Sequence, residues 1–144
     1  MMLIAANLLL YAYDSASEQH GAARDWVAAC FSKPEPVGLA WVTILAFLRI
    51  ATNPRMRFQP FTAAEAVAVV QEWVERPNMT ILESTERHWT ILQALIRKAQ
   101  VRGALTMDAH LAALAIEHGA VLYSNDRDFS RFPGLKWVNP LETS

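Results

Sequence analysis

The chain contains a single cysteine, Cys30, so it lacks the pair that an internal disulfide requires. Cys30 falls among apolar residues with helical spacing, a pattern typical of a buried free thiol. A protein without disulfides suits a reducing compartment. We therefore expect a cytoplasmic protein.

Long hydrophobic runs are also lacking. The longest apolar stretch near the start covers residues 8–13, far fewer than the roughly 20 residues that span a bilayer as a helix. No basic segment precedes this stretch, as one would in a signal peptide. The sequence predicts neither a membrane span nor a secretory signal.

Charge of one sign is not in excess either, because 13 basic residues stand against 14 acidic ones and give a net charge of -1. Bulk attraction to a polyanion is thereby excluded, so nucleic-acid binding would need a local basic patch or a metal. The four histidines form no recognisable ligand pair, which argues against a zinc site. Arg127 and Arg131 are interpreted as solvated charges rather than phosphate clamps.

Apolar residues are plentiful: they make up 53% of the 144 residues. This content is enough for one packed core, and we expect a single domain over residues 1–144. Five tryptophans and five methionines add much apolar area, which favours a homodimer. Three of the tryptophans, Trp41, Trp73 and Trp89, fall in helical patterns and are expected in the core.

Short apolar runs alternate with amphipathic segments along the chain. The runs predict strands at residues 2–6, 37–39, 79–82 and 120–123. The amphipathic segments predict helices at residues 18–32, 41–51, 62–76, 85–102 and 107–118. Thr62 and Glu65 have the spacing of a capping box, and Thr106 is a candidate cap of the last helix. This order predicts an α/β fold with a mainly parallel sheet flanked by helices.

Polar side chains follow the ends of the predicted strands. Asn7 comes just after the first strand, Asp108 lies in the first turn of a helix, and Ser124, Asp126 and Asp128 follow a late strand. Sites in parallel sheets gather at the carboxyl ends of strands. A few carboxylates that converge there suffice for Mg²⁺, which prefers oxygen ligands.

Each acid also has a simpler interpretation. Asp108 taken alone is a common type of residue at a helix start, where it interacts with the helix dipole. Asp126 and Asp128 could be ordinary turn residues. His110 and His118 are expected to be packing or surface residues rather than catalysts. The function must therefore rest on the set of acids rather than on one of them.

Four segments in order give the chain a family resemblance. They are ANLLLYAYD at residues 6–14, FLRIATNP at 47–54, DAHLAALA at 108–115, and SNDRDF at 124–129 followed by PGL. Together these segments resemble PIN-domain VapC toxins. The resemblance implies a PIN-like domain and an endoribonuclease that depends on Mg²⁺, with Mn²⁺ as a substitute, and that cuts RNA of the tRNA or rRNA class. It also implies inhibition by a VapB-type antitoxin encoded beside it.

Two acids of the resembled family are missing. The family has Asp-Ala-Asn where this chain has Ala5, Ala6 and Asn7, so the first metal-binding carboxylate is absent. A glutamate carried by many members aligns with Ala46, another residue without a ligand atom.

The remaining site positions carry over from the family. The resemblance assigns metal binding to Asp108 and Asp126, with Asp128 close by as a further catalytic acid. It makes Asn7 and Ser124 supporting neighbours that position ligands or water.

Three hypotheses about the function compete. The first is a ribonuclease toxin whose native aspartate was replaced because the active protein harms its expression host. The second is a natural, non-catalytic PIN-like module that binds RNA or antitoxin. The third, a metal-dependent phosphatase, needs a nucleophilic aspartate at the first strand end, and Ala5 gives it no support.

Overall fold

A five-stranded parallel sheet forms the centre of the computed structural model, which describes residues 1–57 and 59–142. The strand order is β3-β2-β1-β4-β5, and every neighbouring pair is parallel. The strands are β1 (Met2–Ile4), β2 (Val37–Leu39), β3 (Met79–Ile81), β4 (Val121–Tyr123) and β5 (Trp137–Val138). The predicted α/β class with a parallel sheet is confirmed. The expected single domain also includes residues 58, 143 and 144, which lie outside the described residues.

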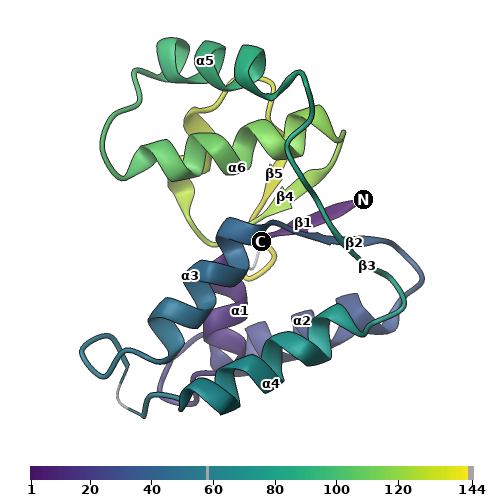
Figure 1. Cartoon of the computed structure of the whole chain (residues 1–144), viewed down its shortest axis with the longest axis vertical. Coiled ribbons are helices and arrows are strands. Elements are labelled where there is room, and N and C mark those ends of the chain that lie inside the picture. Colours follow the sequence, from purple (N-terminus) through teal and green to yellow (C-terminus); the bar gives the residue numbers. More distant parts are fainter. Residues whose placement is uncertain (58, 143–144) are drawn as a thin grey trace.

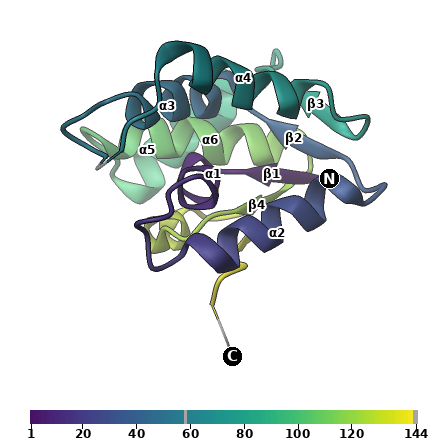
Figure 2. The ribbon, with the colours of Figure 1, turned by 90° about the horizontal axis from the view of Figure 1, so that it is seen from below.

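Helices cover both faces of this sheet. They are α1 (Ala6–Ala12), α2 (His20–Ser32), α3 (Trp41–Ala51), α4 (Ala63–Val74), α5 (His88–Ala99), α6 (Leu105–Glu117) and the short 3₁₀ helix η1 (Arg127–Arg131). In Figure 1, α5 and α6 lie above the strands and α1 to α4 lie below them. Figure 2 shows α1 between α2 and α4. None of the helices in the described part of the chain is long and apolar enough to cross a membrane.

The alternation of side chains along β1 divides the interior into two cores. Leu3 packs into the core beneath α5 and α6, whereas Met2 and Ile4 pack into the core formed with α1 to α4. Successive strand residues point to opposite faces, so a strand with helices on both sides must be apolar throughout. This requirement explains why the strands read as continuous apolar runs.

The lower core is organised around Trp73 of α4, as expected from the sequence. Its ring meets Phe47 of α3 edge to face, with ring centroids 4.7 Å apart, and its indole N–H donates to the Tyr13 hydroxyl at 3.3 Å. Cys30 is buried in the same core, and burial raises the pKa of its thiol to about 11. The predicted buried free thiol is confirmed.

The prediction that Trp41 and Trp89 belong to the core is wrong, because they are 53% and 64% exposed. Trp41 is the first residue of α3, and the buried side of that helix is formed by Thr43, Ile44 and Phe47 instead. In α5, His88 and not Trp89 packs against α6 in the first turn.

Some of the residues predicted to begin or end a helix do so, and one does not. The capping box of α4 is present, since Thr62 Oγ1 accepts from the Glu65 N–H at 3.1 Å and Glu65 Oε1 accepts from the Thr62 N–H at 2.9 Å. The assignment of Thr106 as a cap is wrong, because α6 begins earlier and its N-cap is Ala104. Gly119 ends α6 as expected, at φ 64°, a conformation that favours glycine.

Candidate metal centre

The candidate centre lies where β1 and β4 end side by side. The Ala5 N–H donates to the Tyr123 carbonyl at 3.0 Å and so joins the two strand ends. The strand order reverses at β1, because β2 and β3 lie on one side of it in the sheet and β4 and β5 lie on the other. Open parallel sheets form a crevice at such a point, outside the carboxyl ends of the strands.

Three carboxylates meet at this crevice. Asp108 comes from the first turn of α6, Asp126 is the N-cap of η1, and Asp128 lies in the first turn of η1. One oxygen from each carboxylate lies within 4.8 Å of the others, close enough for all three to bind one ion. The structure therefore brings together the three acids that the sequence singled out.

The electrostatics of this cluster favour a bound cation. Partial burial, followed by the negative charges of Asp126 and Asp128, raises the pKa of Asp108 to about 6, while Arg131 acts in the opposite direction. A divalent cation would relieve this repulsion, and carboxylate oxygens are the ligands that hard divalent ions prefer. The acids that are present thus fit a metal ion.

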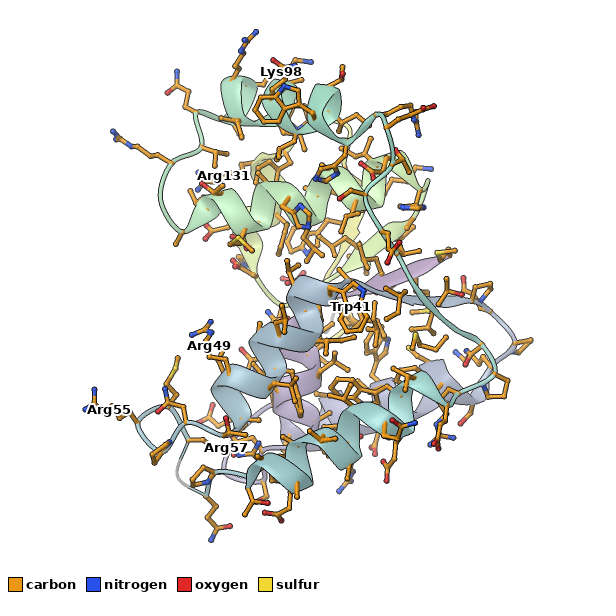
Figure 3. All side chains as sticks on the ribbon, in the orientation of Figure 1. Trp41, Arg49, Arg55, Arg57, Lys98 and Arg131 are labelled. Carbon is orange, nitrogen blue, oxygen red and sulfur yellow. The ribbon has the colours of Figure 1, made fainter. Side chains whose placement is uncertain are left out.

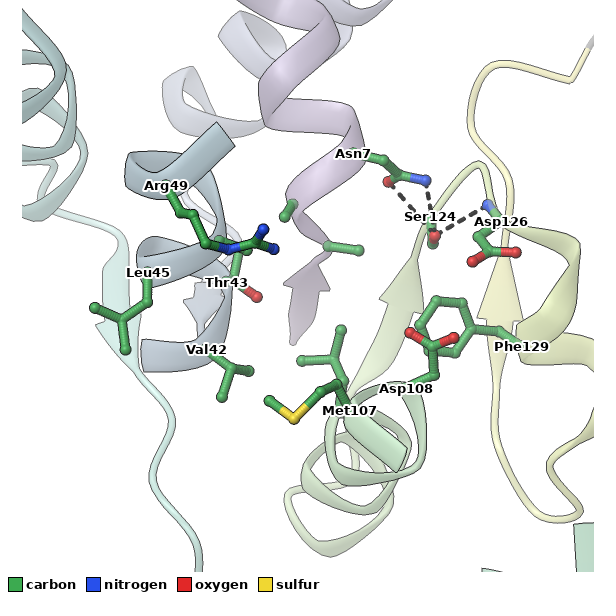
Figure 4. A pocket seen from close by; sticks show the side chains of 14 residues that line it. Asn7, Val42, Thr43, Leu45, Arg49, Met107, Asp108, Ser124, Asp126 and Phe129 are labelled. Carbon is green, nitrogen blue, oxygen red and sulfur yellow. Dashed lines mark hydrogen bonds between the residues drawn. The ribbon is translucent and has the colours of Figure 1, made fainter. Parts of the chain in front are cut away.

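Ser124 and Asn7 position the acid at the end of β4. Ser124 is fully buried, and its Oγ accepts from the Asp126 N–H at 3.0 Å and from Asn7 Nδ2 at 3.3 Å. Asp126 Oδ1 in turn accepts from the Asp128 N–H at 2.9 Å. Figure 4 shows the contacts of Ser124 with Asn7 and Asp126 beside the Asp108 carboxylate. The structure thus brings Asn7 and Ser124 next to Asp126, and their supporting role in a metal site stays a prediction.

A cleft of about 390 Å³ opens between α3 and the start of α6, next to the acids. Ala5 and Ala46 both line it. Ala5 directly follows β1, and its methyl group lines the cleft although the residue is only 4% exposed. A longer side chain at this position would therefore extend into the cleft. Neither alanine offers a ligand atom, so any metal here depends on the acids of α6 and η1.

A buried histidine and glutamate network was not anticipated from the sequence. His88 Nδ1 lies 2.6 Å from Glu117 Oε2, and His88 Nε2 lies 2.9 Å from His110 Nδ1. The Thr85 N–H donates to Glu117 Oε1 at 2.7 Å. These residues are joined only by the packing of α5 on α6, so no spacing in the sequence could reveal them. Within the described residues, they belong to no group of three or more ligands suited to a metal.

Replacing Glu117 should destabilise the protein strongly. Its side chain is fully buried, and Glu117→Ala would leave the Thr85 N–H and His88 without their partner. We expect the free energy of unfolding to fall by about 3 kcal/mol, measured by urea denaturation. Glu86→Ala, at an exposed position two residues before α5, should change it by less than about 0.5 kcal/mol. Equal stability of the two variants would contradict a structural role for this network.

Comparison with known proteins agrees with this geometry. The family model described as PIN domain matches residues 2–135. The chain is 39% identical to ribonuclease VapC37 of Mycobacterium tuberculosis, with 97% of each chain covered. It is 32% identical to VapC ribonuclease Mb2897 of Mycobacterium bovis, over 99% of this chain and 97% of the relative.

Solved structures share the fold at low identity. FitAB bound to a DNA fragment superposes with a TM-score of 0.70 at 16% identity, covering 100% of this chain and 98% of that one. VapBC-1 from nontypeable Haemophilus influenzae superposes with a TM-score of 0.69 at 15% identity, covering 98% of both chains. With a matching family model and close relatives over nearly its whole length, the chain belongs to the PIN-domain family of VapC ribonucleases.

Proposed function

We propose that this chain is the toxin of a type II toxin-antitoxin system, an endoribonuclease that uses Mg²⁺ to cut cellular RNA of the tRNA or rRNA class, and that Ala5 impairs this copy. The observation that carries the proposal is the convergence of Asp108, Asp126 and Asp128 at the ends of β1 and β4. Membership of a ribonuclease family supports the reaction, and the all-oxygen donor set supports magnesium or manganese.

The residues of the chain have separate parts in this proposal. Asp108, Asp126 and Asp128 would hold the ion, which would supply Lewis acidity toward a phosphate and would lower the pKa of a bound water molecule. Ser124 fixes the backbone of Asp126, and Asn7 holds the Ser124 hydroxyl. With a pKa of about 6, Asp108 is mostly ionised at neutral pH, as a metal ligand must be.

Ala5 favours a second candidate function. A site with alanines at positions 5 and 46 has fewer carboxylates than the family site, which supports a non-catalytic PIN-like module that binds RNA or antitoxin. The native gene separates the two functions. An aspartate codon at position 5 supports an engineered, impaired ribonuclease, whereas an alanine codon supports the binding module.

Sequencing of RNA ends after brief expression tests the ribonuclease proposal. An Ala5→Asp chain should produce new ends at a few positions in tRNA or rRNA. A chain that carries both Ala5→Asp and Asp108→Asn should not produce them. If the same ends appear with both chains, the acid cluster is not responsible for the cleavage.

The partner, the cellular location and the domain organisation of the protein are also part of the proposal. Solved structures with this fold include VapBC toxin-antitoxin complexes, which supports a VapB-type antitoxin as the partner. The buried, unpaired thiol of Cys30 supports a cytoplasmic location. One sheet runs through the described residues, which supports a single PIN domain.

We expect the isolated chain to form a homodimer. Large apolar side chains lie on its surface, among them Trp41, Val67 and Trp89 at 53%, 59% and 64% exposure. Tryptophan is enriched at protein–protein interfaces relative to the rest of a protein surface. Light scattering at high micromolar concentration, without antitoxin, should give twice the 16.1 kDa of one chain. A mass that stays at the monomer value would contradict the expectation.

A further inference from the structure

Two polar residues of α3 face the cleft without a part in the metal centre. Thr43 and Arg49 line the cleft together with Asp108 and Asp126, which come from the opposite side. We propose that Thr43 and Arg49 form a phosphate-binding subsite for single-stranded RNA on the α3 side of the cleft. This inference deepens the proposed function and rests on it, since RNA is the ligand.

The Thr43 hydroxyl is buried without a partner. The residue is 2% exposed, and its Oγ1 makes no hydrogen bond with any residue that the structure describes. Thr52 at the other end of α3 shows the usual alternative, because its Oγ1 donates to the Leu48 carbonyl at 2.7 Å. Thr43 has no such carbonyl in its own helix, since the residue four positions earlier, Leu39, lies in β2 and its carbonyl accepts from the Leu82 N–H. A buried hydroxyl without a partner is rare, and this one lines a cleft where a ligand would supply the missing contact.

Arg49 brings a positive charge to the same cleft. Its side chain is exposed, and no acid among the described residues lies within ion-pair distance of it. Ala46, one turn earlier on α3, also lines the cleft and has no carboxylate to neutralise it. Figure 4 shows the Arg49 guanidinium above the Thr43 hydroxyl, across the opening from Asp108 and Asp126. The charge is therefore free to bind a ligand.

The two sides of the cleft suit successive parts of an RNA strand. A cation held by the acids would attract one phosphate, and the guanidinium can donate two parallel hydrogen bonds to another. Leu45 and Met107 also line the cleft, at 59% and 55% exposure, and offer apolar surface to a base or ribose. Single-stranded RNA combines phosphates with exposed bases in this way. An anionic ligand is thus recognised without a net positive charge on the protein.

Binding of a fluorescein-labelled, mixed-sequence single-stranded RNA, followed by anisotropy in EDTA, tests the inference without cleavage. Arg49→Ala should weaken binding by about tenfold and reduce the slope of log K against log salt by about 0.7. The matched control is Arg55→Ala, which removes the same charge from the turn after α3, where Figure 3 shows the side chain pointing away from the cleft. It should change the affinity by less than about twofold.

Thr43→Val separates ligand binding from folding. The variant keeps the shape of the side chain and removes only the unpartnered hydroxyl, so the melting temperature should stay the same or rise. RNA binding should nevertheless weaken by about threefold, the loss of a single hydrogen bond.

Three results would overturn the subsite. In the first, the parent chain does not bind the RNA in EDTA. In the second, Arg49→Ala and Arg55→Ala reduce the RNA affinity equally, and in the third, Arg49→Ala keeps its RNA affinity but no longer binds the antitoxin. The last result would assign the α3 side of the cleft to a protein ligand. In contrast, an Ala5→Asp chain that binds RNA through Arg49 but cuts none would contradict the proposed nuclease alone.

Discussion

An Ala5→Asp chain should cleave RNA in magnesium at least about a hundredfold faster than the parent chain. Position 5 follows β1, lines the cleft and is joined through its backbone to the end of β4. A carboxylate here would add an oxygen ligand to the three acids already present. Single groups that stabilise charge in a transition state contribute about a hundredfold or more to rate. The measurement is the initial rate of cleavage of total cellular RNA by purified protein.

Ala5→Asn is the matched control for this gain. It supplies a side chain of nearly the same shape with a carbonyl oxygen but without the charge, so it should recover little of the activity. EDTA should abolish whatever cleavage the aspartate restores. A folded Ala5→Asp chain that leaves total RNA intact would remove the main support for an impaired ribonuclease and favour the binding module.

In the Ala5→Asp background, Asp108→Asn should lower the cleavage rate by at least about a hundredfold while the fold persists. The exchange keeps the shape of the side chain and removes one of three carboxylates that lie within 4.8 Å of one another. If Asp108 were only a helix-start acid, its loss would cost about 0.3 to 1 kcal/mol of stability and leave activity intact. Cleavage rate and melting temperature, measured on the same samples, distinguish these outcomes.

Asp14→Asn provides the control for the loss of an acid. Asp14 Oδ1 accepts from the Ala16 N–H at 3.1 Å in the turn after α1, and the residue does not line the metal-centre cleft. Its exchange should leave the cleavage rate within about twofold. A comparable loss from Asp14→Asn would show that the effect of Asp108→Asn is not specific to the cluster.

The difference in stability between the Asp108→Asn variant and the parent chain should depend on pH. Because the pKa of Asp108 is raised to about 6 in the folded protein, its charge disfavours the folded state above that pH. The folded chain therefore loses stability as pH rises from about 4 to 6, and asparagine avoids this loss. In EDTA, the melting temperature of the variant should exceed that of the parent above pH 6 and approach it below pH 4.

Elements with strong local signals could be predicted from the sequence. Residues 41–51 and 37–39 were expected as a helix and a strand, and α3 and β2 have these bounds. The seven residues of α1 were missed because they continue the apolar run of β1 without a side-chain cap. The two residues of β5 are too few for any periodicity, and they pair with β4 only in the folded sheet.

The candidate site could be predicted in part for the same physical reason. Asp108, Asp126 and Asp128 follow predictable strand and helix ends, so a parallel sheet brings them together. No sequence pattern shows that Thr43 Oγ1 lacks a partner or that Arg49 lacks an acid, because both facts depend on the surrounding tertiary structure. Likewise, His88 rather than Trp89 faces the interior because its ring contacts the buried Glu117 of α6.

The hydrogen bond between Asn7 and Ser124 joins residues 117 positions apart in the chain. A ribosome that has made β1 must continue through β4 and η1 before β4 can pair with β1 and the acid cluster can form beside the cleft. Domains of this kind complete such distant contacts only once both segments have left the ribosome. A nascent or prematurely ended chain therefore contains no assembled acid cluster. For a member of a ribonuclease family, this order of assembly leaves the unfinished chain without the candidate metal centre until synthesis has passed η1.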